Sequence, residues 1–286
     1  MAAGTGVHSI VERISPSAVR DEPFPHVVVE NALPADYYAE LEAGYPSLDY
    51  VAGPGSLENN TLYLKSAAEV LEDQRVPAVW REFFAYHCSQ AFFREVCDFW
   101  RTWIERLHPD LEQNFAKPLD DFTVGLRRAG KHEEPENRSS DVMMDCQFGT
   151  SSPVREVSSM RGPHVDNRAK LFAALLYFRH VDDDSTGAEL ELHRLKGSRY
   201  PKRQSTRIDS GLLECAERIP YGRNKLVMWL NSALSIHGVS PRSVTRMPRR
   251  YVNFLGECYA GRREDYFTAF PARRLWPRRV LERLRA

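Results

Sequence analysis

Hydrophobic positions follow a helical spacing in the first part of the chain. Between Ala67 and Leu107 they recur every three or four residues, which is typical of an amphipathic helix packed on a sheet. This face consists of Phe84, Cys88, Phe92, Val96, Phe99 and Trp103, and we expect core residues here rather than a cofactor pocket. Upstream, the pattern predicts a short strand from His26 to Val29, a helix that starts near Pro34, and a loop over residues 51–60.

The spacing changes after Lys117. Seven segments are short, apolar or alternating, and are separated by Gly, Pro, Asn and Asp, which is typical of strands. They cover residues 121–130, 141–150, 170–181, 188–195, 224–233, 234–241 and 249–260. Several such strands at short intervals predict a β barrel or jelly roll, and the preceding helices would cover one of its faces.

The chain is expected to form one domain. Its 286 residues could fill two domains of average size, but a single β-rich core absorbs this length. We divide it into a strand and helical support layer at 24–116, a jelly-roll core at 117–260 and a basic C-terminal tail at 261–286. No segment has the run of apolar residues that a transmembrane helix needs, and the N-terminus lacks the apolar stretch of a secretory signal.

Charge and cysteine content exclude several functions. The 39 basic residues balance the 39 acidic ones, so neither nucleic acid nor a membrane surface is expected as a partner. The five cysteines are scattered without a CxxC pair, which argues against a disulfide framework or a structural zinc site. Reduced thiols favour a cytoplasmic protein.

Three residues in the second half form a candidate metal site. His164 and Asp166 stand two positions apart, so in an extended strand both side chains point to the same face. His237 follows in a later strand. Two imidazoles and one carboxylate are the facial ligand set of non-haem Fe(II), which leaves coordination positions open, whereas structural zinc would need a fourth protein ligand. Alone, the H-x-D pair is a weak signal, and a loop aspartate beside a surface histidine stays the alternative.

An arginine near the start of a strand strengthens the metal interpretation. Arg250 follows His237 and precedes the apolar run YVNF. A guanidinium held there is a natural partner for a carboxylate, through paired N–H donors. Open metal positions and a nearby arginine together describe a site for a 2-oxo acid.

The order of these motifs resembles the Fe(II)- and 2-oxoglutarate-dependent dioxygenases, in particular the prolyl-4-hydroxylase-like branch. The resemblance is carried by H-x-D, then LFAALLYF, DDDSTGAELELH, NKLVMWLNSALSIHGVSP and RRYVNFLG. It spans residues 24–259 and is strongest over 161–256. It implies a mainly β fold with helices, namely a double-stranded β-helix (a cupin-like jelly roll) flanked by N-terminal helices.

The resemblance also implies a role for each site residue. His164, Asp166 and His237 would bind Fe(II), and Arg250 would pair with the distal carboxylate of 2-oxoglutarate. Arg249 and Arg246 are adjacent alternatives; Arg250 is preferred because it stands immediately before YVNF. Tyr177 would donate to the same carboxylate, or else be an aromatic residue at the barrel rim.

The implied reaction consumes 2-oxoglutarate and O2, releases succinate and CO2, and oxidises an unactivated C–H bond. Asp166 is present where halogenating relatives carry a small residue, so hydroxylation or desaturation is preferred. Two departures from the family pattern are Gly187-Ala188 in place of Gly-Gly and a lengthened stretch between Asp166 and His237.

The substrate is the least defined part of the prediction. Five polar residues near the metal motif are candidate substrate contacts, although solvated surface charge is an equally good explanation for the arginines: Gln147, Arg155, Arg161, Asn167 and Arg168. The basic segment 193–207 is either a lid that holds an anionic group or an ordinary exposed loop. The Arg-rich tail is either a short helix against the body or solvated surface.

Three functions of different classes stay open. The first is an oxygenase acting on a small molecule, an anionic one included. The second is a hydroxylase of a protein or peptide side chain. The third is a non-catalytic barrel that binds a metal or ligand. The triad and the arginine together argue against the third, and the oligomeric state is left open between monomer and homo-oligomer.

Overall fold

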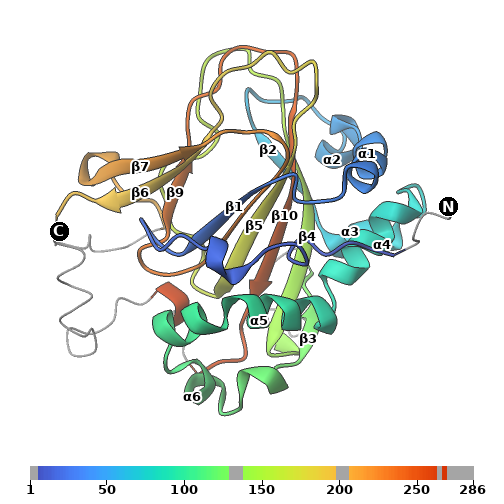
Figure 1. The fold of residues 1–286 in the computed structure, drawn as a ribbon. Coiled ribbons are helices and arrows are strands. Elements are labelled where there is room, and N and C mark those ends of the chain that lie inside the picture. The colour runs from blue at the N-terminus through green and yellow to red at the C-terminus, as the bar shows by residue number, and fades with distance from the viewer. Residues whose placement is uncertain (1–5, 129–137, 198–205, 263–265, 269–286) are drawn as a thin grey trace.

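The computed structural model describes residues 6–128, 138–197, 206–262 and 266–268 (Figure 1). The basic segment 193–207, interpreted as either a lid or an exposed loop, and the tail at 261–286 lie largely outside these residues. All five cysteines are described and all are free thiols, as the scattered spacing predicted. Among the described residues, no helix combines the length and apolar composition needed to span a bilayer.

Two β-sheets form the centre of the molecule. The larger sheet has the strand order β1-β8-β5-β10-β4-β2, with β3 paired in parallel to β4. Its strands are β1 (His26–Glu30), β2 (Leu62–Lys65), β3 (Val124–Leu126), β4 (Val142–Ser151), β5 (Lys170–Phe178), β8 (Arg223–Leu230) and β10 (Arg249–Glu257). The smaller sheet has the order β7-β6-β9 and contains β6 (Leu190–Leu195), β7 (Leu213–Ile219) and β9 (Ile236–Val239). Strands β2 and β7 were not expected from the sequence.

The chain passes back and forth between the two sheets. After β4 in the large sheet, the segment around His164 pairs with His237 at the free side of β9, as a one-residue bridge. The chain then returns to the large sheet in β5, to the small one in β6 and β7, and alternates again through β8, β9 and β10. This alternation is that of a double-stranded β-helix, so the predicted jelly roll is confirmed.

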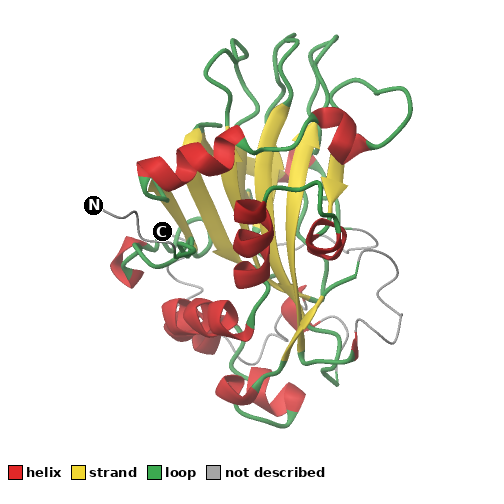
Figure 2. Cartoon of the chain, turned by 90° about the vertical axis from the view of Figure 1, so that its right-hand side faces the viewer, coloured by secondary structure: helices red, strands yellow, loops and turns green. Residues whose placement is uncertain are grey.

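The helices cover one face of the large sheet, and in Figure 2 they lie in front of the strands. The helices are α1 (Ala35–Ala43), α2 (Leu48–Ala52), α3 (Ala67–Glu72), α4 (Ala78–His87), α5 (Gln90–Leu107) and α6 (Leu111–Phe115), with 3-10 turns η1 (Pro16–Ala18), η2 (Leu119–Asp121), η4 (Ser210–Leu212) and η5 (Tyr266–Thr268).

The continuous helix expected from Ala67 to Leu107 is wrong, because Pro77 starts α4 and the Ser89 side chain caps the first turn of α5. The loop expected at 51–60 begins two residues late, since α2 extends to Ala52.

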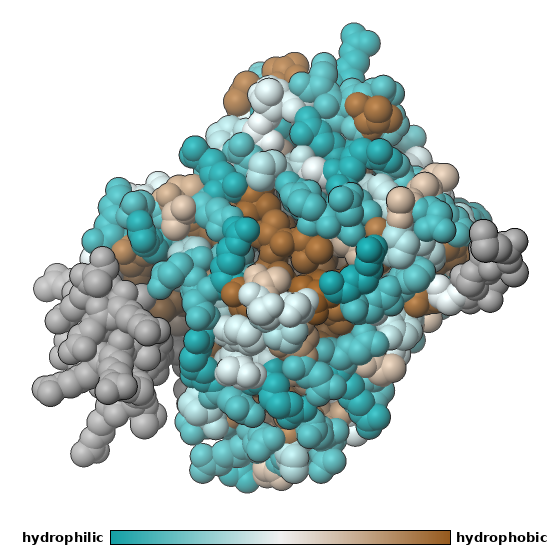
Figure 3. All heavy atoms as spheres, viewed as in Figure 1, coloured by the Kyte–Doolittle hydropathy of each residue, from teal (hydrophilic) through white to brown (hydrophobic). Residues whose placement is uncertain are grey.

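Two apolar layers hold these parts together. The helices and the outer face of the large sheet share the main core, to which Trp80, Phe148 and Phe254 belong. A second cluster fills the space between the two sheets and includes Leu192 of the small sheet and Trp229 of the large one. On the molecular surface, hydrophobic side chains gather near the centre of the face seen in Figure 3, above α5, and the rest of this face is mostly hydrophilic. Because the sheets are separated by side chains, a site between them is shielded from bulk water.

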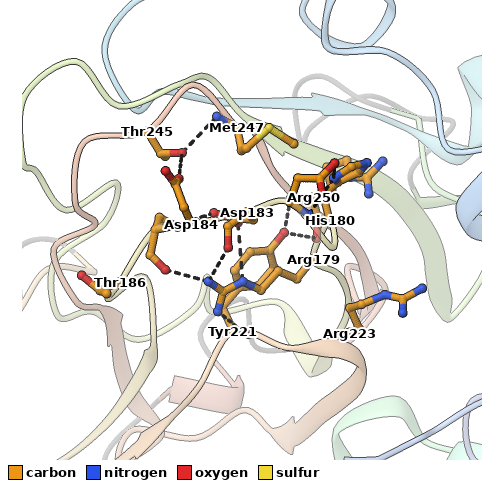
Figure 4. A network of polar contacts seen from close by, with 12 residues as sticks. Arg179, His180, Asp183, Asp184, Thr186, Tyr221, Arg223, Thr245, Met247 and Arg250 are labelled. Carbon is orange, nitrogen blue, oxygen red and sulfur yellow. Dashed lines mark hydrogen bonds and ion pairs between the residues drawn. The ribbon is translucent and has the colours of Figure 1, made fainter.

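Three loops extend beyond one end of the sheets, at the top of Figure 1. We call them the crown loops: residues 152–160, 179–189 and 240–248. The second and third are joined by a buried ion pair between Arg242 and Asp183, with 2.9 Å between nitrogen and oxygen. Thr245 Oγ1 donates to Asp184 in the same network (Figure 4). These contacts give the crown loops a defined shape.

Candidate metal site and inter-sheet pocket

Two histidines lie side by side at the β9 edge of the small sheet. Backbone hydrogen bonds of 2.8 and 2.9 Å join His164 to His237, and their ring centroids are 4.3 Å apart. Each Nδ1 lies 2.9 Å from a backbone carbonyl, that of Gly162 for the first ring and that of Ser235 for the second. A carbonyl only accepts, so each Nδ1 carries the proton and each Nε2 presents a lone pair.

Asp166 completes the group from the same side of its segment. Its Oδ1 accepts from Lys170 Nζ at 2.9 Å, while its Oδ2 has no partner among the described residues and lies 4.0 Å from His237 Nε2. One ligand atom from each of His164, Asp166 and His237 falls within 4.8 Å of the others. All three residues are at most 5% exposed. Two of these ligand atoms, His164 Nε2 and Asp166 Oδ2, have no hydrogen-bond partner among the described residues, and with His237 Nε2 beside them they form a fitting site for a divalent metal.

The protonation states suit metal binding. Burial lowers the pKa of His164 well below its usual value and also lowers the pKa of His237, so both imidazoles are neutral near pH 7. Burial alone would raise the pKa of Asp166, but the Lys170 ammonium and the two imidazoles more than offset it and hold that pKa below its usual range. A metal would therefore not have to displace protons from its ligands.

The spacing of His164 and Asp166 had suggested a regular strand, but the two residues do not lie on one. The segment is extended but pairs only through the bridges at His164. Side chains still alternate along it, because Val165 points the other way, into a small cluster with Ile208 and Ile236. The side-chain alternation that the prediction needed is therefore present, although the segment does not form a continuous ladder of backbone hydrogen bonds with a neighbouring strand.

A buried arginine lies on the inner face of the large sheet. Arg249 is 1% exposed, and its guanidinium carbon lies 5.0 Å from the ring centroids of Tyr177, Tyr221 and Tyr251. Its Nε and Nη2, like the hydroxyl of Tyr177, have no hydrogen-bond partner among the described residues. Its Nη1 meets only the thioether sulfur of Met160, at 3.8 Å, and a buried guanidinium is costly unless an anion meets it. Arg249 and Tyr177 thus form a fitting site for a carboxylate.

Arg250 does not point into this site, so the sequence expectation for its side chain is wrong. Its Nε donates to the carbonyl of Phe178 at 3.1 Å, and its guanidinium lies 5.1 Å from the centre of the Tyr45 ring, on the helix-covered face. Successive residues of a strand face opposite ways, so Arg249 takes the inner position. It was named only as an alternative because both arginines precede the same apolar run.

Sequence reasoning also missed two residues beside the metal ligands. Lys170 holds Asp166 and was hidden in a segment interpreted only as a strand. Trp229 packs on His237 with ring centroids 4.7 Å apart, and its Nε1 has no partner among the described residues. The strand pattern of β8 alternates inner Val227 and Trp229 with outer Leu226 and Met228, which could have placed Trp229 between the sheets.

The candidate substrate residues are dispersed. Gln147 lies on the inner face but is engaged with Asp145 at 2.8 Å and with Asn253 at 2.9 Å. Asn167 shapes a turn by accepting from the amides of Ala169 and Lys170. The other three candidates, Arg155, Arg161 and Arg168, are exposed. Of these, Arg155 lies on a cleft in the crown loops and Arg161 on a cleft beside His164.

The cleft beside His164 has a volume of about 540 Å³ and is lined by residues 159–164 and 206–208. His164 lines it although its Nε2 is buried. The cleft contains Arg161 and Arg207, and no carboxylate lines it among the described residues.

Comparison with known proteins gives structural likeness without sequence likeness. No protein-family model and no curated protein matches the chain. The chain is similar to a prolyl-4-hydroxylase from Pseudomonas putida, with 14% identity, coverage of 82% of this chain and 92% of the other, and a TM-score of 0.43. It is similar to a prolyl hydroxylase from Trichoplax adhaerens solved with a hypoxia inducible factor peptide, with 12% identity, coverage of 82% and 83%, and a TM-score of 0.42. It is also similar to SnoN, a non-haem alpha-ketoglutarate-dependent epimerase of nogalamycin biosynthesis, with 11% identity, coverage of 82% and 76%, and a TM-score of 0.44. Because these values are low, the function proposed below rests on the residues of this chain.

Proposed function

We propose that this protein is an Fe(II)- and 2-oxoglutarate-dependent oxygenase that oxidises an unactivated C–H bond of a small molecule. The observation that carries the proposal is the pairing of two unsatisfied groups in one inter-sheet space. One is the set of ligand atoms on His164, Asp166 and His237. The other is the guanidinium of Arg249, which no described carboxylate meets, with the hydroxyl of Tyr177. A metal and a dicarboxylate with one chelating end satisfy both.

The protein's own residues orient the metal ligands. The carbonyls of Gly162 and Ser235 set the two imidazole tautomers, and Lys170 occupies one oxygen of Asp166 so that the other is offered alone. Three single-atom ligands from one side leave positions open on the other side of the metal. When bound, Fe(II) with 2-oxoglutarate and O2 supplies the oxidising power, with succinate and CO2 as products.

The large sheet orients the co-substrate. Arg249 and Tyr177 lie together on the inner face of adjacent strands β10 and β5, where the guanidinium would bind the distal carboxylate through paired N–H donors. Trp229 and Leu192 line the space between the sheets and exclude water from it. Exclusion of water strengthens the arginine–carboxylate attraction and protects a reactive site from hydrolysis.

Asp166 favours hydroxylation or desaturation as the outcome. The carboxylate occupies the third ligand position, so no such position is left for a halide. A protein or peptide side chain is the alternative substrate, and a non-catalytic binding barrel is a further alternative that the complete set of ligand and carboxylate-binding residues disfavours.

The metal and co-substrate assignment is tested by adding Fe(II) and then 2-oxoglutarate without oxygen. We expect a visible charge-transfer band of the chelated complex in the wild-type protein. In His164→Ala the band should be lost, because a metal held by two side chains binds far more weakly. The matched control is His180→Ala, which removes a histidine from a crown loop and should leave the band unchanged.

Absence of the band in the wild type, or an equal band in His164→Ala, would overturn the assignment. A circular dichroism spectrum of each variant shows whether the fold is retained. Oxygen is admitted in a second step, with a panel of metabolites and of peptides. Succinate release stimulated by a peptide and by no metabolite would replace the small-molecule proposal with the peptide alternative.

A further inference from the structure

Two arginines line the cleft beside the proposed metal site. Arg161 stands three residues before His164, and Arg207 pairs with His164 through an isolated β-bridge. The backbone ties both in place: the carbonyl of Arg161 accepts from Val239 at 2.9 Å, and the residues on either side of Arg207 hydrogen-bond across to Val165 and Pro163. Both side chains are exposed at the cleft.

Within the part of the chain that the structure describes, neither guanidinium has a hydrogen-bond or ion-pair partner. Among the described residues, no carboxylate, carbonyl or hydroxyl accepts a hydrogen bond from the side chain of Arg161 or Arg207. Other exposed arginines of the two sheets are paired, as Arg194 is with Glu214 and Arg218 with Glu191. Since no carboxylate lines the cleft either, its positive charge is not neutralised from within the described part of the protein.

Arg161 lies beside the candidate metal site, because it lines the same cleft as His164. Its charge also opposes the burial that raises the pKa of Tyr251. Tyr251 lies against Arg249 on the large sheet. The guanidinium of Arg161 therefore lies on the exposed side of the His164 segment, at the cleft.

The remaining charges at the site are already matched. Asp166 is paired with Lys170, and Arg249 would be matched by the co-substrate carboxylate. Arg161 and Arg207 at the cleft have no such counter-charge among the residues that the structure describes. Guanidinium groups bind carboxylate and phosphate through two parallel N–H donors, and a pair of them favours an anion over a neutral group.

We propose that the substrate carries an anionic group, a carboxylate or a phosphate, which Arg161 and Arg207 bind at the cleft while the rest of the molecule extends past His164 toward the metal. This inference rests on the proposed function and names the substrate class of the same site. The arginines act in binding and specificity and take no part in the oxidation.

The first test measures binding without turnover. Inorganic phosphate and acetate are titrated into the metal-free protein by calorimetry, for the wild type, Arg161→Gln, Arg207→Gln and the control Arg155→Gln, which removes an exposed arginine from the crown loops. Apart from any anion bound at Arg249, we expect one anion site in the wild type, and an affinity of that site reduced by about tenfold in each cleft variant, the equivalent of roughly 1.4 kcal/mol for one charge-assisted contact. Arg155→Gln should bind as the wild type does. Unchanged affinity in both cleft variants would overturn the proposal, because the anion would then bind elsewhere, for example at Arg249.

The second test uses matched pairs of candidate substrates: a carboxylic acid and its amide, and a phosphate monoester and its parent alcohol. Only the charged member of a pair should stimulate succinate release, and Arg161→Gln should raise its KM about tenfold while leaving the KM for 2-oxoglutarate unchanged. The pair that responds identifies the anion as carboxylate or phosphate. Equal stimulation by neutral members would overturn the anionic substrate. If the wild type formed no anaerobic charge-transfer band, the proposed function itself would be overturned, so the two failures are distinct.

Discussion

Two adjacent arginines at the start of β10 have different environments. Arg249 lies among three tyrosines between the sheets, and Arg250 lies over Tyr45 beneath the helices. Their chemistry is identical, so only the strand face separates a candidate co-substrate residue from a structural one. A sequence pattern that ends at an apolar run cannot choose between them, because it does not say at which residue the strand pairing begins.

Because of this difference, replacing each arginine by glutamine should affect different properties: co-substrate binding for Arg249 and thermal stability for Arg250. Arg249→Gln should weaken binding of 2-oxoglutarate by about 10- to 100-fold, because a charge-assisted contact to a carboxylate contributes roughly 1.5–3 kcal/mol. Arg250→Gln should leave that affinity within about twofold and lower the melting temperature, since its contacts are with Phe178 and Tyr45. Titration of 2-oxoglutarate against the anaerobic band, with thermal unfolding in parallel, measures both. If Arg250→Gln weakened 2-oxoglutarate binding and Arg249→Gln did not, Arg250 would be the residue that binds the co-substrate carboxylate.

At the scale of elements, turns and helix ends determine where the crown loops and the support layer lie. The helical stretch from Ala67 is divided because proline and a capping serine start new helices at Ala78 and Gln90. The segment before β6 turns through Gly187, whose φ of +78° is in the left-handed region, and a Cβ there would lie 1.9 Å from the carbonyl oxygen of Pro241. This close approach brings two crown loops together.

Gly187→Ala should therefore destabilise the protein. The added methyl group must displace backbone and would occupy a disfavoured conformation, so we expect a loss of about 2 kcal/mol or more in the free energy of unfolding. Gly197→Ala is the matched control, because a Cβ at that position meets nothing within 4 Å. Urea unfolding of both variants and of the wild type compares them. A Gly187→Ala variant as stable as the control would show that the loops separate without cost.

At the scale of the whole molecule, two buried histidines join the helical layer to other parts of the chain. His87, at the end of α4, donates from Nδ1 to the carbonyl of Phe83 at 2.7 Å and accepts from the amide of Ile10 at 3.2 Å. His108, at the end of α5, donates to the carbonyl of Asn231 at 2.9 Å, just beyond β8. Burial lowers the pKa of His87 to about 3 and that of His108 to about 4.

These depressed pKa values predict loss of stability in mild acid. The unfolded chain takes up a proton near pH 6.5 while the folded one does not, so the neutral histidines stabilise the fold above that pH and the contribution declines as pH falls toward the folded pKa. Between pH 7 and pH 5 we expect a loss of up to about 2 kcal/mol for each histidine. Urea unfolding at the two pH values measures it. His87→Phe should show a smaller difference than the wild type. If the loss of stability between pH 7 and pH 5 were as large in His87→Phe as in the wild type, protonation of His87 would not be its cause.

The amino-acid sequence by itself determined what depends on local order. Periods of two and of three to four placed the strands and helices, and the spacing of His164 and Asp166 put both side chains on one side because an extended chain alternates. Only the tertiary structure decided which face each residue presents to which neighbour. It paired His237 with His164, brought Lys170 onto Asp166, placed Arg249 and not Arg250 on the inner face, and set Arg161 and Arg207 at one cleft that no described carboxylate lines. The physical reason is that pairing register, burial and the meeting of distant charges are properties of packed sheets, which no local pattern contains.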